Sequence, residues 1–398
     1  MKKLSVLLCA VLLIAMTALP VSAGSMDSVW QGLALEEHHL FATGDLGAMH
    51  MRGFDVTEDG KYILGGVLNP KGQSTLEKID VEKNVNVASY QHKEEDGLIS
   101  YVKGVAIDDR GYVYGGIANN ANKGAVYFAI IELETMKEVH SEKIEIDGKV
   151  GVNGTYVSKI GDRYYLYFVV NYDTDRIYCY DVTDVNNPTL NTAFGDNKGY
   201  MDLTKLDITE GNYLAVDDQG VIYLAATKSD KKVYLMQLTA DGKTVTQSNQ
   251  IDGMYGVDIY KDYLICTNNT KGKTEVYVID KATLKIVSTI KDASGEMNSY
   301  YPYAVVAGNR IYTVEANYLS LGDRIMRTAE INFAAAETTA APTTTAAPTT
   351  TAAPTTTAAP AVTTAPAATP STADNGMIFA MAGLMAVAAC VFMKKRAR

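Results

Sequence analysis

One short pattern recurs six times along the middle of the chain and constrains its fold more than any other feature. Each copy has a residue at which we expect the backbone to kink, a short apolar run, a turn and a second apolar run. The six copies begin at Arg52, Lys103, Asn153, Asn212, Tyr255 and Tyr301. A repeat of roughly 50 residues, made of strands and turns without helical periodicity, is typical of a β-propeller.

Each copy continues with further strand-like runs, so we expect antiparallel units of four strands. Tyr, Val and Ile dominate these runs, as in Val276-Tyr277-Val278-Ile279-Asp280, and Asp-Gly or Lys-Gly pairs supply tight turns between them. The strands expected after each opening run are residues 61–68, 74–81 and 86–91; 112–118, 125–133 and 137–144; 163–170, 175–182 and a weak strand after Pro188; 221–227, 232–238 and 244–249; 263–267, 274–279 and 285–290; and 310–315 and 323–333.

The last copy lacks a fourth strand, and the chain before the first copy can supply it. A propeller has to join its first and last units, because otherwise two sheet edges stay unpaired. We therefore expect residues 38–45 to form the outer strand of the last unit. The sequence predicts an all-β, six-bladed β-propeller closed by an N-terminal strand, with a seven-bladed propeller as the alternative.

One repeat resembles a known family. Residues 274–290, with the Ala282-Thr283 turn and the Val287-Ser288-Thr289-Ile290 strand, are similar to a repeat of the YVTN family of bacterial surface propellers. Ile265-Cys266-Thr267-Asn268 stands at the position of that family's Tyr-Val-Thr-Asn signature, and Phe168-Val169-Val170-Asn171 is a looser match. The resemblance implies an adhesion or surface-layer module rather than an enzyme.

The first residues have the pattern of an export signal. Lys2 and Lys3 precede an apolar run, and Val21-Ser22-Ala23 offers the small residues that signal peptidase accepts. We expect residues 1–23 to be a signal peptide and residues 24–333 to form the exported propeller domain.

The C-terminal part has the composition of a tether. Residues 334–375 consist almost entirely of Ala, Thr and Pro, which cannot build a core, so we expect a disordered, extended stalk. Residues 376–393 carry no charge and are long enough for a membrane-spanning helix, and the basic residues 394–398 should stay in the cytoplasm before any processing. These segments predict a protein displayed at the cell surface.

Five residues before the apolar segment 376–393 indicate a second way in which the chain could be anchored. Thr369, Pro370, Ser371, Thr372 and Ala373 resemble a sortase sorting signal, in which Thr369 replaces the usual leucine. Sortase would join the chain to peptidoglycan after Thr372. Cell-wall attachment and a retained membrane span both stay open.

The net charge of the chain narrows the set of partners that we expect. The chain has a net charge of −10, and several of its cations lie at the two ends, so the expected propeller is acidic. The acidic charge argues against a nucleic-acid partner, because attraction to phosphate supplies most of the affinity of proteins for nucleic acids.

Cys179 and Cys266 lie in apolar runs of different repeats, and we expect buried free thiols rather than a disulfide.

The six kink residues are the first candidate binding site. In a propeller, Arg52, Lys103, Asn153, Asn212, Tyr255 and Tyr301 would surround one mouth of the central channel, where cations, amides and phenols could bind an extracellular glycan or protein. The alternative is that each merely turns the chain. A second set follows the second strands and is interpreted as turn residues: Asn69, Asn119, Asn171, Asn268 and Asn317.

An enzyme is the less favoured interpretation. The segment from Gly195 to Gly211 contains Asp196, Asp202, Asp207 and Glu210, which could bind calcium but lack its usual spacing, so a solvated acidic loop is favoured and no cofactor is expected. No motif places a nucleophile beside a base. We expect a binding or adhesion module; an extracellular glycosidase, lyase or quinone-dependent dehydrogenase, and a structural surface-layer component, are the alternatives.

Overall fold

The computed structural model describes residues 30, 33–40, 50–68, 74–93, 100–119, 123–268, 275–292, 300–316 and 324–331. The expected signal peptide, stalk, sorting signal, membrane span and basic tail lie outside these residues. Within them, no helix is long and apolar enough to cross a bilayer. The described part is all-β, with one short 3₁₀ helix, η2 (Leu203–Leu206).

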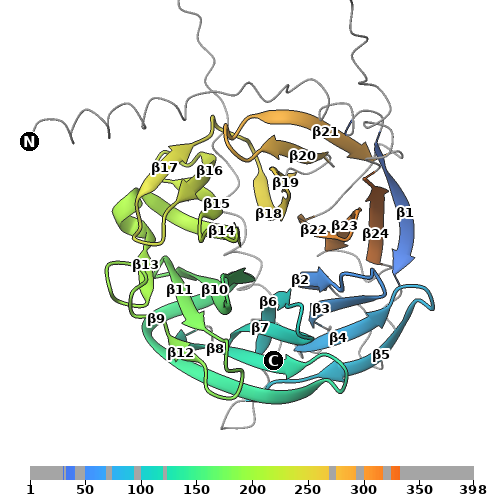
Figure 1. Ribbon diagram of the computed structural model, residues 1–398, viewed down its shortest axis with the longest axis horizontal. Helices are drawn as coiled ribbons and strands as arrows, with labels where there is room; N and C mark the ends of the chain where they lie inside the picture. Colours follow the sequence, from blue (N-terminus) through green and yellow to red (C-terminus); the bar gives the residue numbers. More distant parts are fainter. Residues whose placement is uncertain are drawn as a thin grey trace, which may run out of the picture. The chain divides into compact units, whose positions relative to one another are not determined.

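The strands form four hydrogen-bonded sheets, which we divide into six groups of antiparallel strands that follow one another along the chain (Figure 1). Group 1 contains β2 (His50–Val56), β3 (Tyr62–Leu68), β4 (Ser74–Asp80) and β5 (Val85–Tyr90). Group 2 contains β6 (Tyr101–Ile107), β7 (Tyr112–Ala118), β8 (Lys123–Glu132) and the first half of β9 (Lys137–Ile160). Group 3 contains the second half of β9 with β10 (Arg163–Tyr172), β11 (Arg176–Asp181), β12 (Thr189–Leu190) and β13 (Tyr200–Asp202).

The remaining three groups have the same order. Group 4 contains β14 (Ile208–Val216), β15 (Ile222–Lys228), β16 (Val233–Leu238) and β17 (Thr244–Gln247). Group 5 contains β18 (Met254–Tyr260), β19 (Tyr263–Asn268), β20 (Glu275–Asp280) and β21 (Ile286–Asp292). Group 6 contains β22 (Tyr300–Ala307), β23 (Arg310–Ala316), β24 (Arg324–Glu330) and β1 (Ala34–Leu40).

Most strand predictions are confirmed with small boundary shifts, but β13 was not predicted and one predicted strand is much longer than expected. The expected strand 137–144 does not end there, because β9 continues to Ile160 and joins groups 2 and 3. Alternate side chains along it stay buried, including Ile144, Ile146, Val150 and Val152. The alternation of buried and exposed side chains therefore continues beyond residue 144, where the repeat had led us to expect the strand to end.

The start of the chain pairs with the last group. β1 runs antiparallel to β24, with His38 opposite Met326, and its first residues also pair with β21 in the parallel direction. The described strand, Ala34–Leu40, begins four residues before the predicted one, and residues 41–45 of the prediction lie outside the described part of the chain. Trp30 and Leu35 anchor this segment in the core, where the Trp30 ring lies 5.2 Å from that of Tyr263.

The N-terminal strand should therefore be essential for stability. Leu35 is fully buried in the core shared by groups 5 and 6. We expect Leu35→Ala to lower the free energy of unfolding by about 3 kcal/mol, because the truncation leaves a cavity. Leu190→Ala, at a site that is 36% exposed, is the control and should change it by less than about 0.5 kcal/mol. Equal effects in urea unfolding would contradict this role of the strand.

The opening strands of the groups lie next to one another in sequence order. β2 contacts β6, then β6 contacts β9, β9 contacts β14, β14 contacts β18, β18 contacts β22, and β22 contacts β2. Six hydrophobic clusters fill the interfaces between consecutive groups, including that between group 6 and group 1. Both faces of the sheets are therefore buried, which explains why every residue of β19 is buried and none of them is charged.

Two glycines of the repeat are explained by the close approach of these strands. A Cβ atom at Gly53 would lie 2.4 Å from the carbonyl oxygen of Lys103 in β6. A Cβ atom at Gly104 would lie 2.0 Å from the hydroxyl oxygen of Thr155 in β9. The glycine that follows the kink residue thus leaves room for the opening strand of the next group.

Candidate functional site

The six predicted kink residues all lie at β-bulges. In every opening strand, two residues face one residue of the second strand at this point, and the register with that strand shifts. Arg52, Lys103, Asn153, Asn212, Tyr255 and Tyr301 occupy the shifts of β2, β6, β9, β14, β18 and β22. The side chains of Arg52 and Tyr301 lie outside the described part.

The four described kink residues have different surroundings. Asn153 donates a hydrogen bond of 2.9 Å to the carbonyl oxygen of Gly211 and so ties β9 to β14. Asn212 is buried, and the buried Lys103 places its ammonium 5.7 Å from the ring centroid of Tyr172. Tyr255 belongs to an aromatic cluster. The tether made by Asn153 agrees with the alternative interpretation, in which these residues shape the chain.

An aromatic cluster lies between the bulges and the middle of the opening strands. Tyr213 is at its centre, with ring centroids 4.5 Å from Tyr303 and 5.3 Å from Tyr255. Phe54 extends the cluster, 6.3 Å from Tyr303. The hydroxyl of Tyr213 donates to the carbonyl oxygen of Lys103, 3.3 Å away, so this side chain spans from group 4 to group 2.

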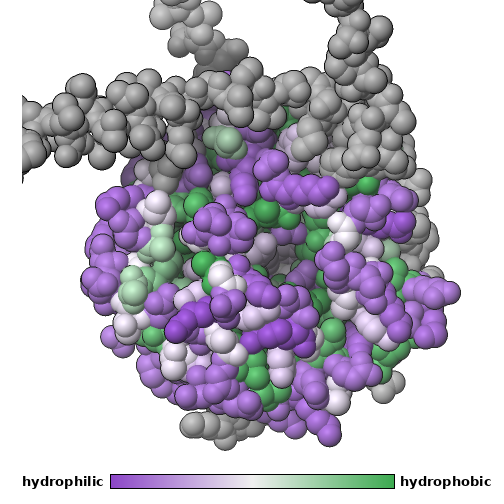
Figure 2. Space-filling model, viewed as in Figure 1, coloured by the Kyte–Doolittle hydropathy of each residue, from purple (hydrophilic) through white to green (hydrophobic). Residues whose placement is uncertain are grey.

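Beyond the aromatic cluster, the opening strands of all six groups enclose a cavity of about 320 Å³, here called the central cavity. Figure 2 shows a hollow among the sheets. Tyr213, Tyr303 and Phe54 form its aromatic wall, and aliphatic side chains such as Val257 and Leu214 line its sides. None of the four described kink residues lines it. The cavity lies in the half of the opening strands that leads to their turns.

Two carboxyl groups, Asp55 of β2 and Asp258 of β18, face this cavity. Asp55 accepts hydrogen bonds of 2.7 Å from the backbone N–H groups of Val56 and of Ile107 in the next group. Asp258 is held in the same way, by Ile259 at 2.8 Å and by Val306 of the next group at 2.7 Å. Each carboxyl therefore bridges its own strand and the neighbouring opening strand.

The surroundings of the two carboxyl groups shift their pKa values by different amounts. Burial raises the pKa of Asp55 to about 8, and the charge of Asp258 adds to this rise. Burial raises the pKa of Asp258 to about 6, while backbone N–H groups and the Tyr156 hydroxyl limit the rise. Near pH 7 the pair therefore holds about one proton and one negative charge.

Tyr156 of β9 completes this group of side chains. Burial, followed by the charges of Asp258 and Asp55, raises the pKa of Tyr156 well above its usual value. Its hydroxyl therefore stays protonated and acts as a hydrogen-bond donor toward Asp258. One neutral acid, one carboxylate and one phenol thus meet inside the cavity.

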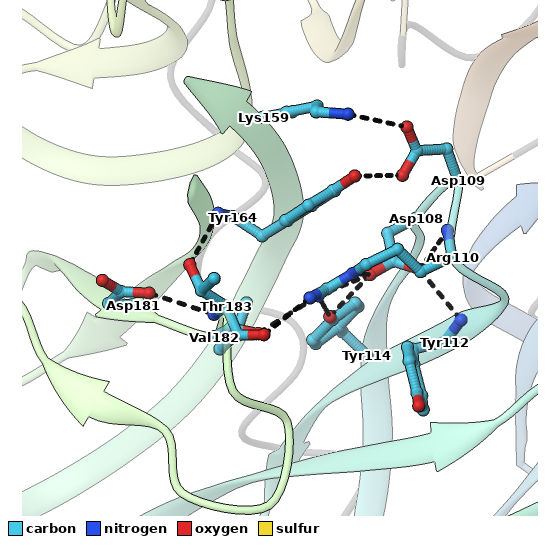
Figure 3. Close-up of polar contacts among 10 residues, drawn as sticks. All are labelled: Asp108, Asp109, Arg110, Tyr112, Tyr114, Lys159, Tyr164, Asp181, Val182 and Thr183. Atoms are coloured by element: carbon cyan, nitrogen blue, oxygen red, sulfur yellow. Dashed lines mark hydrogen bonds and ion pairs between the residues drawn. The ribbon is translucent and has the colours of Figure 1, made fainter. Parts of the chain in front are cut away.

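The rim of the cavity is held by a network around Arg110 (Figure 3). Its guanidinium donates to Asp108 at 2.8 Å and to the carbonyl oxygens of Val182 and Thr183 at 3.1 and 2.8 Å. It also stacks on the ring of Tyr164 at 3.7 Å. Asp108 lines the cavity, so these contacts fix part of its rim between groups 2 and 3.

The planar shape of the Arg110 guanidinium, as well as its charge, should contribute to the stability of the protein. We expect Arg110→Lys to lower the free energy of unfolding by about 2 kcal/mol, because an ammonium cannot make the same forked contacts. Arg163→Lys is the control, since Arg163 makes one exposed ion pair of 2.7 Å with Asp181 and should contribute below about 1 kcal/mol. Equal losses in urea unfolding would contradict this role of Arg110.

The asparagines predicted after the second strands serve local contacts where they are described. Asn119 bonds the backbone of Lys123 in both directions, as expected of a turn residue. Asn268 donates to the Tyr277 hydroxyl at 2.8 Å, and the Asn171 side chain is buried. Asn69 and Asn317 lie outside the described residues.

The acidic segment from Gly195 to Gly211 folds into β13, η2 and the start of β14. Asp202 caps η2 through Thr204, and Asp196 pairs with Lys205 at 2.8 Å. Asp207 lies 3.8 Å from Lys228. In the part of the chain that the structure describes, no group of three or more His, Cys, Asp or Glu side chains is arranged to hold a metal ion.

Sequence reasoning missed Asp55, Asp258 and Tyr156. All three occupy the same position, the third residue after the kink residue in the first, fifth and third repeats. A signal was present, because Phe54-Asp55-Val56 and Val257-Asp258-Ile259 each place an acid inside an apolar run. Acids are rare at such positions unless they are bonded or functional.

Comparisons with known proteins describe the fold only coarsely. No protein-family model matches the chain, and no curated protein matches it. Among the solved structures that match, a protein of unknown function from Bacteroides caccae is 8% identical over 63% of this chain and 80% of its own, with a TM-score of 0.42. A likeness of this degree carries no argument about the site.

Proposed function

We propose that the protein is a six-bladed β-propeller, displayed at the cell surface, that binds an extracellular ligand in its central channel. The cyclic order of contacts among the opening strands and the pairing of β1 with β24 support the propeller. The export signal, stalk and C-terminal anchor of the sequence support surface display, either by a membrane span or by sortase attachment to peptidoglycan.

The central cavity is the observation that carries the binding proposal. Two half-buried carboxyl groups and a half-buried phenol converge there from strands that are distant in sequence, beside an aromatic wall. Such a combination of apolar walls with a few converging polar groups is typical of ligand sites. The ligand classes consistent with surface display are a glycan or a protein segment that enters the cavity.

An array of glycans and matrix proteins, probed with the purified protein, tests the proposal. Two sets of substitutions locate the site: Asp258→Asn at the cavity, and Arg52, Lys103 and Tyr301 together to Ala at the bulges. Loss of a saturable signal in the first variant assigns binding to the cavity, and loss in the second assigns it to the bulge end. If no array member binds saturably, the binding proposal is wrong.

Acid–base catalysis is the second candidate function. Two carboxyl groups with different pKa values, about 8 for Asp55 and about 6 for Asp258, resemble the acid and base of hydrolytic or eliminating enzymes. A glycosidase or lyase would lose turnover of its polysaccharide in Asp55→Asn and in Asp258→Asn while still binding it. Release of reducing ends from a panel of polysaccharides is the measurement, and a binding module would release none.

A further inference from the structure

The charged side chains in the described lining of the central cavity are all acidic. The described lining contains no lysine or arginine. It contains five acidic residues, Asp55, Glu58, Asp108, Asp109 and Asp258. The rim acids have cationic neighbours, since Asp108 is bonded to Arg110 at 2.8 Å and Asp109 lies 3.4 Å from Lys159. The two inner carboxyl groups are bonded instead by neutral donors, namely backbone N–H groups and Tyr156.

Within its described lining, the cavity therefore holds a negative charge without a matching cation. Burying an ionised carboxylate costs several kcal/mol unless a cation or hydrogen bonds offset it. Asp55 and Asp258 lower that cost by retaining a proton, as their raised pKa values of about 8 and about 6 indicate. A cationic ligand could take the place of this proton.

The geometry favours an organic cation over a metal ion. Each of the four oxygens of Asp55 and Asp258 already accepts a backbone N–H bond, which orients both groups and leaves only one lone pair on each oxygen for a metal. Calcium takes six to eight oxygen ligands, whereas an ammonium group requires only nearby negative charge and aromatic faces. The rings of Tyr213 and Tyr303, whose centroids are 4.5 Å apart, are part of the cavity wall.

We propose that the central cavity binds a small organic monocation, an ammonium group with an apolar body, with Asp55 and Asp258 as its counter-ions. The volume of about 320 Å³ suits a small ligand, and the aliphatic residues Val257 and Leu214 suit its apolar part. This inference rests on the proposed binding function and names the chemical class that the cavity accepts. The same group on a lysine-like side chain of a protein, or on an amino sugar, shares this chemistry.

Isothermal titration of the purified protein with choline chloride tests the inference. The control ligand is 3,3-dimethyl-1-butanol, which has the same shape as choline without its charge. We expect saturable binding of choline, and binding of the alcohol that is weaker by about 30-fold or more, because the loss of one partner of a buried charge pair costs about 2–5 kcal/mol. Equal binding of the two compounds, or binding of calcium chloride in place of choline, would overturn the inference.

Substitutions place the binding in the cavity. Asp258→Asn should weaken choline binding by about 30-fold. Asp59→Asn, which removes an exposed carboxylate from the turn after β2, should leave it unchanged. Unchanged affinity in a folded Asp258→Asn protein would overturn the inference.

If Asp258→Asn does not fold, the pH dependence of choline binding to the unmodified protein tests the inference instead. Protons compete with the ligand, so choline affinity should rise by about tenfold from pH 5 to pH 7 as Asp258, with a pKa of about 6, becomes charged. The charged or titratable groups that interact with the pair are Glu58, Tyr156 and the Cys266 thiol, with Asp217 beside Tyr156. An affinity that does not change with pH would contradict the role of the pair.

The array test of the proposed function separates the two failures. If a glycan or protein binds and Asp258→Asn abolishes the binding, but choline does not bind, only the inference about an organic cation is wrong. If neither the array members nor choline bind, both proposals are wrong.

Discussion

Gly104→Ala should lower the free energy of unfolding by about 3 kcal/mol, enough to leave little folded protein at moderate urea concentrations. The added Cβ atom would lie 2.0 Å from the hydroxyl oxygen and 2.6 Å from the Cβ atom of Thr155. Both strands are held in their sheets and by their neighbouring groups, so neither can move away cheaply. Urea unfolding followed by circular dichroism measures the effect.

The same substitution elsewhere in group 2 is the control. A Cβ atom at Gly115 in β7 would meet its nearest neighbour, Val102, at 3.7 Å, an ordinary contact distance. Gly115→Ala should therefore change the stability by less than about 1 kcal/mol, in either direction. Thr155→Gly combined with Gly104→Ala removes the two closest atoms and should restore part of the loss. If both alanine variants are equally stable, the close approach of β6 and β9 is wrong.

Asp55→Asn should change how the stability of the protein depends on pH. In the folded protein Asp55 has a pKa of about 8, whereas its ordinary value is 3.8, so the folded state binds more protons than the unfolded state between these values. The stability of the unmodified protein should therefore fall as the pH rises from about 4 to about 8. Asparagine does not titrate, so between pH 4 and pH 9 the variant should gain on the order of 3 kcal/mol relative to the unmodified protein.

Asp59→Asn is the matched control for this experiment. The Thr57 hydroxyl and the backbone N–H of Lys61 lower the pKa of Asp59, so its contribution is present above its ordinary pKa and is lost as the pH falls below that value. The difference between this variant and the unmodified protein should stay constant from pH 5 to pH 9. Urea unfolding at pH 4, 5, 7 and 9 measures both variants. Parallel curves for Asp55→Asn and the unmodified protein would show that Asp55 is not a buried acid.

Much of the local structure could be predicted from the sequence, because it depends on short-range patterns. The apolar runs gave nearly all strand boundaries, and the recurring kink marked a β-bulge in every opening strand. The exception, β9, arose because the strand spans two repeats and its alternation has no break. Gly53 and Gly104 follow their kink residues because the opening strand of the next group lies close by, which no local pattern reveals.

The candidate site could be predicted only in part. The kink residues were proposed as a binding ring, yet Asn153 bonds the next group and Tyr255 packs in the aromatic cluster. Asp55 and Asp258 were overlooked because both faces of these sheets are buried, so alternation along a strand does not show which side chain faces the cavity. An acid inside an apolar run was the available signal.

The sequence by itself determined the all-β class, the sixfold repeat and the position of each bulge, because strand propensity and turn chemistry act over a few neighbouring residues. Our prediction of export, anchoring and surface display likewise depends on the composition of the two terminal segments alone. Only the tertiary structure decided which residues meet, since the cyclic packing of the opening strands brings Asp55, Tyr156 and Asp258 together from three separate groups. Their raised pKa values follow from that enclosure, because burial disfavours a charged carboxylate or phenolate that water would otherwise solvate.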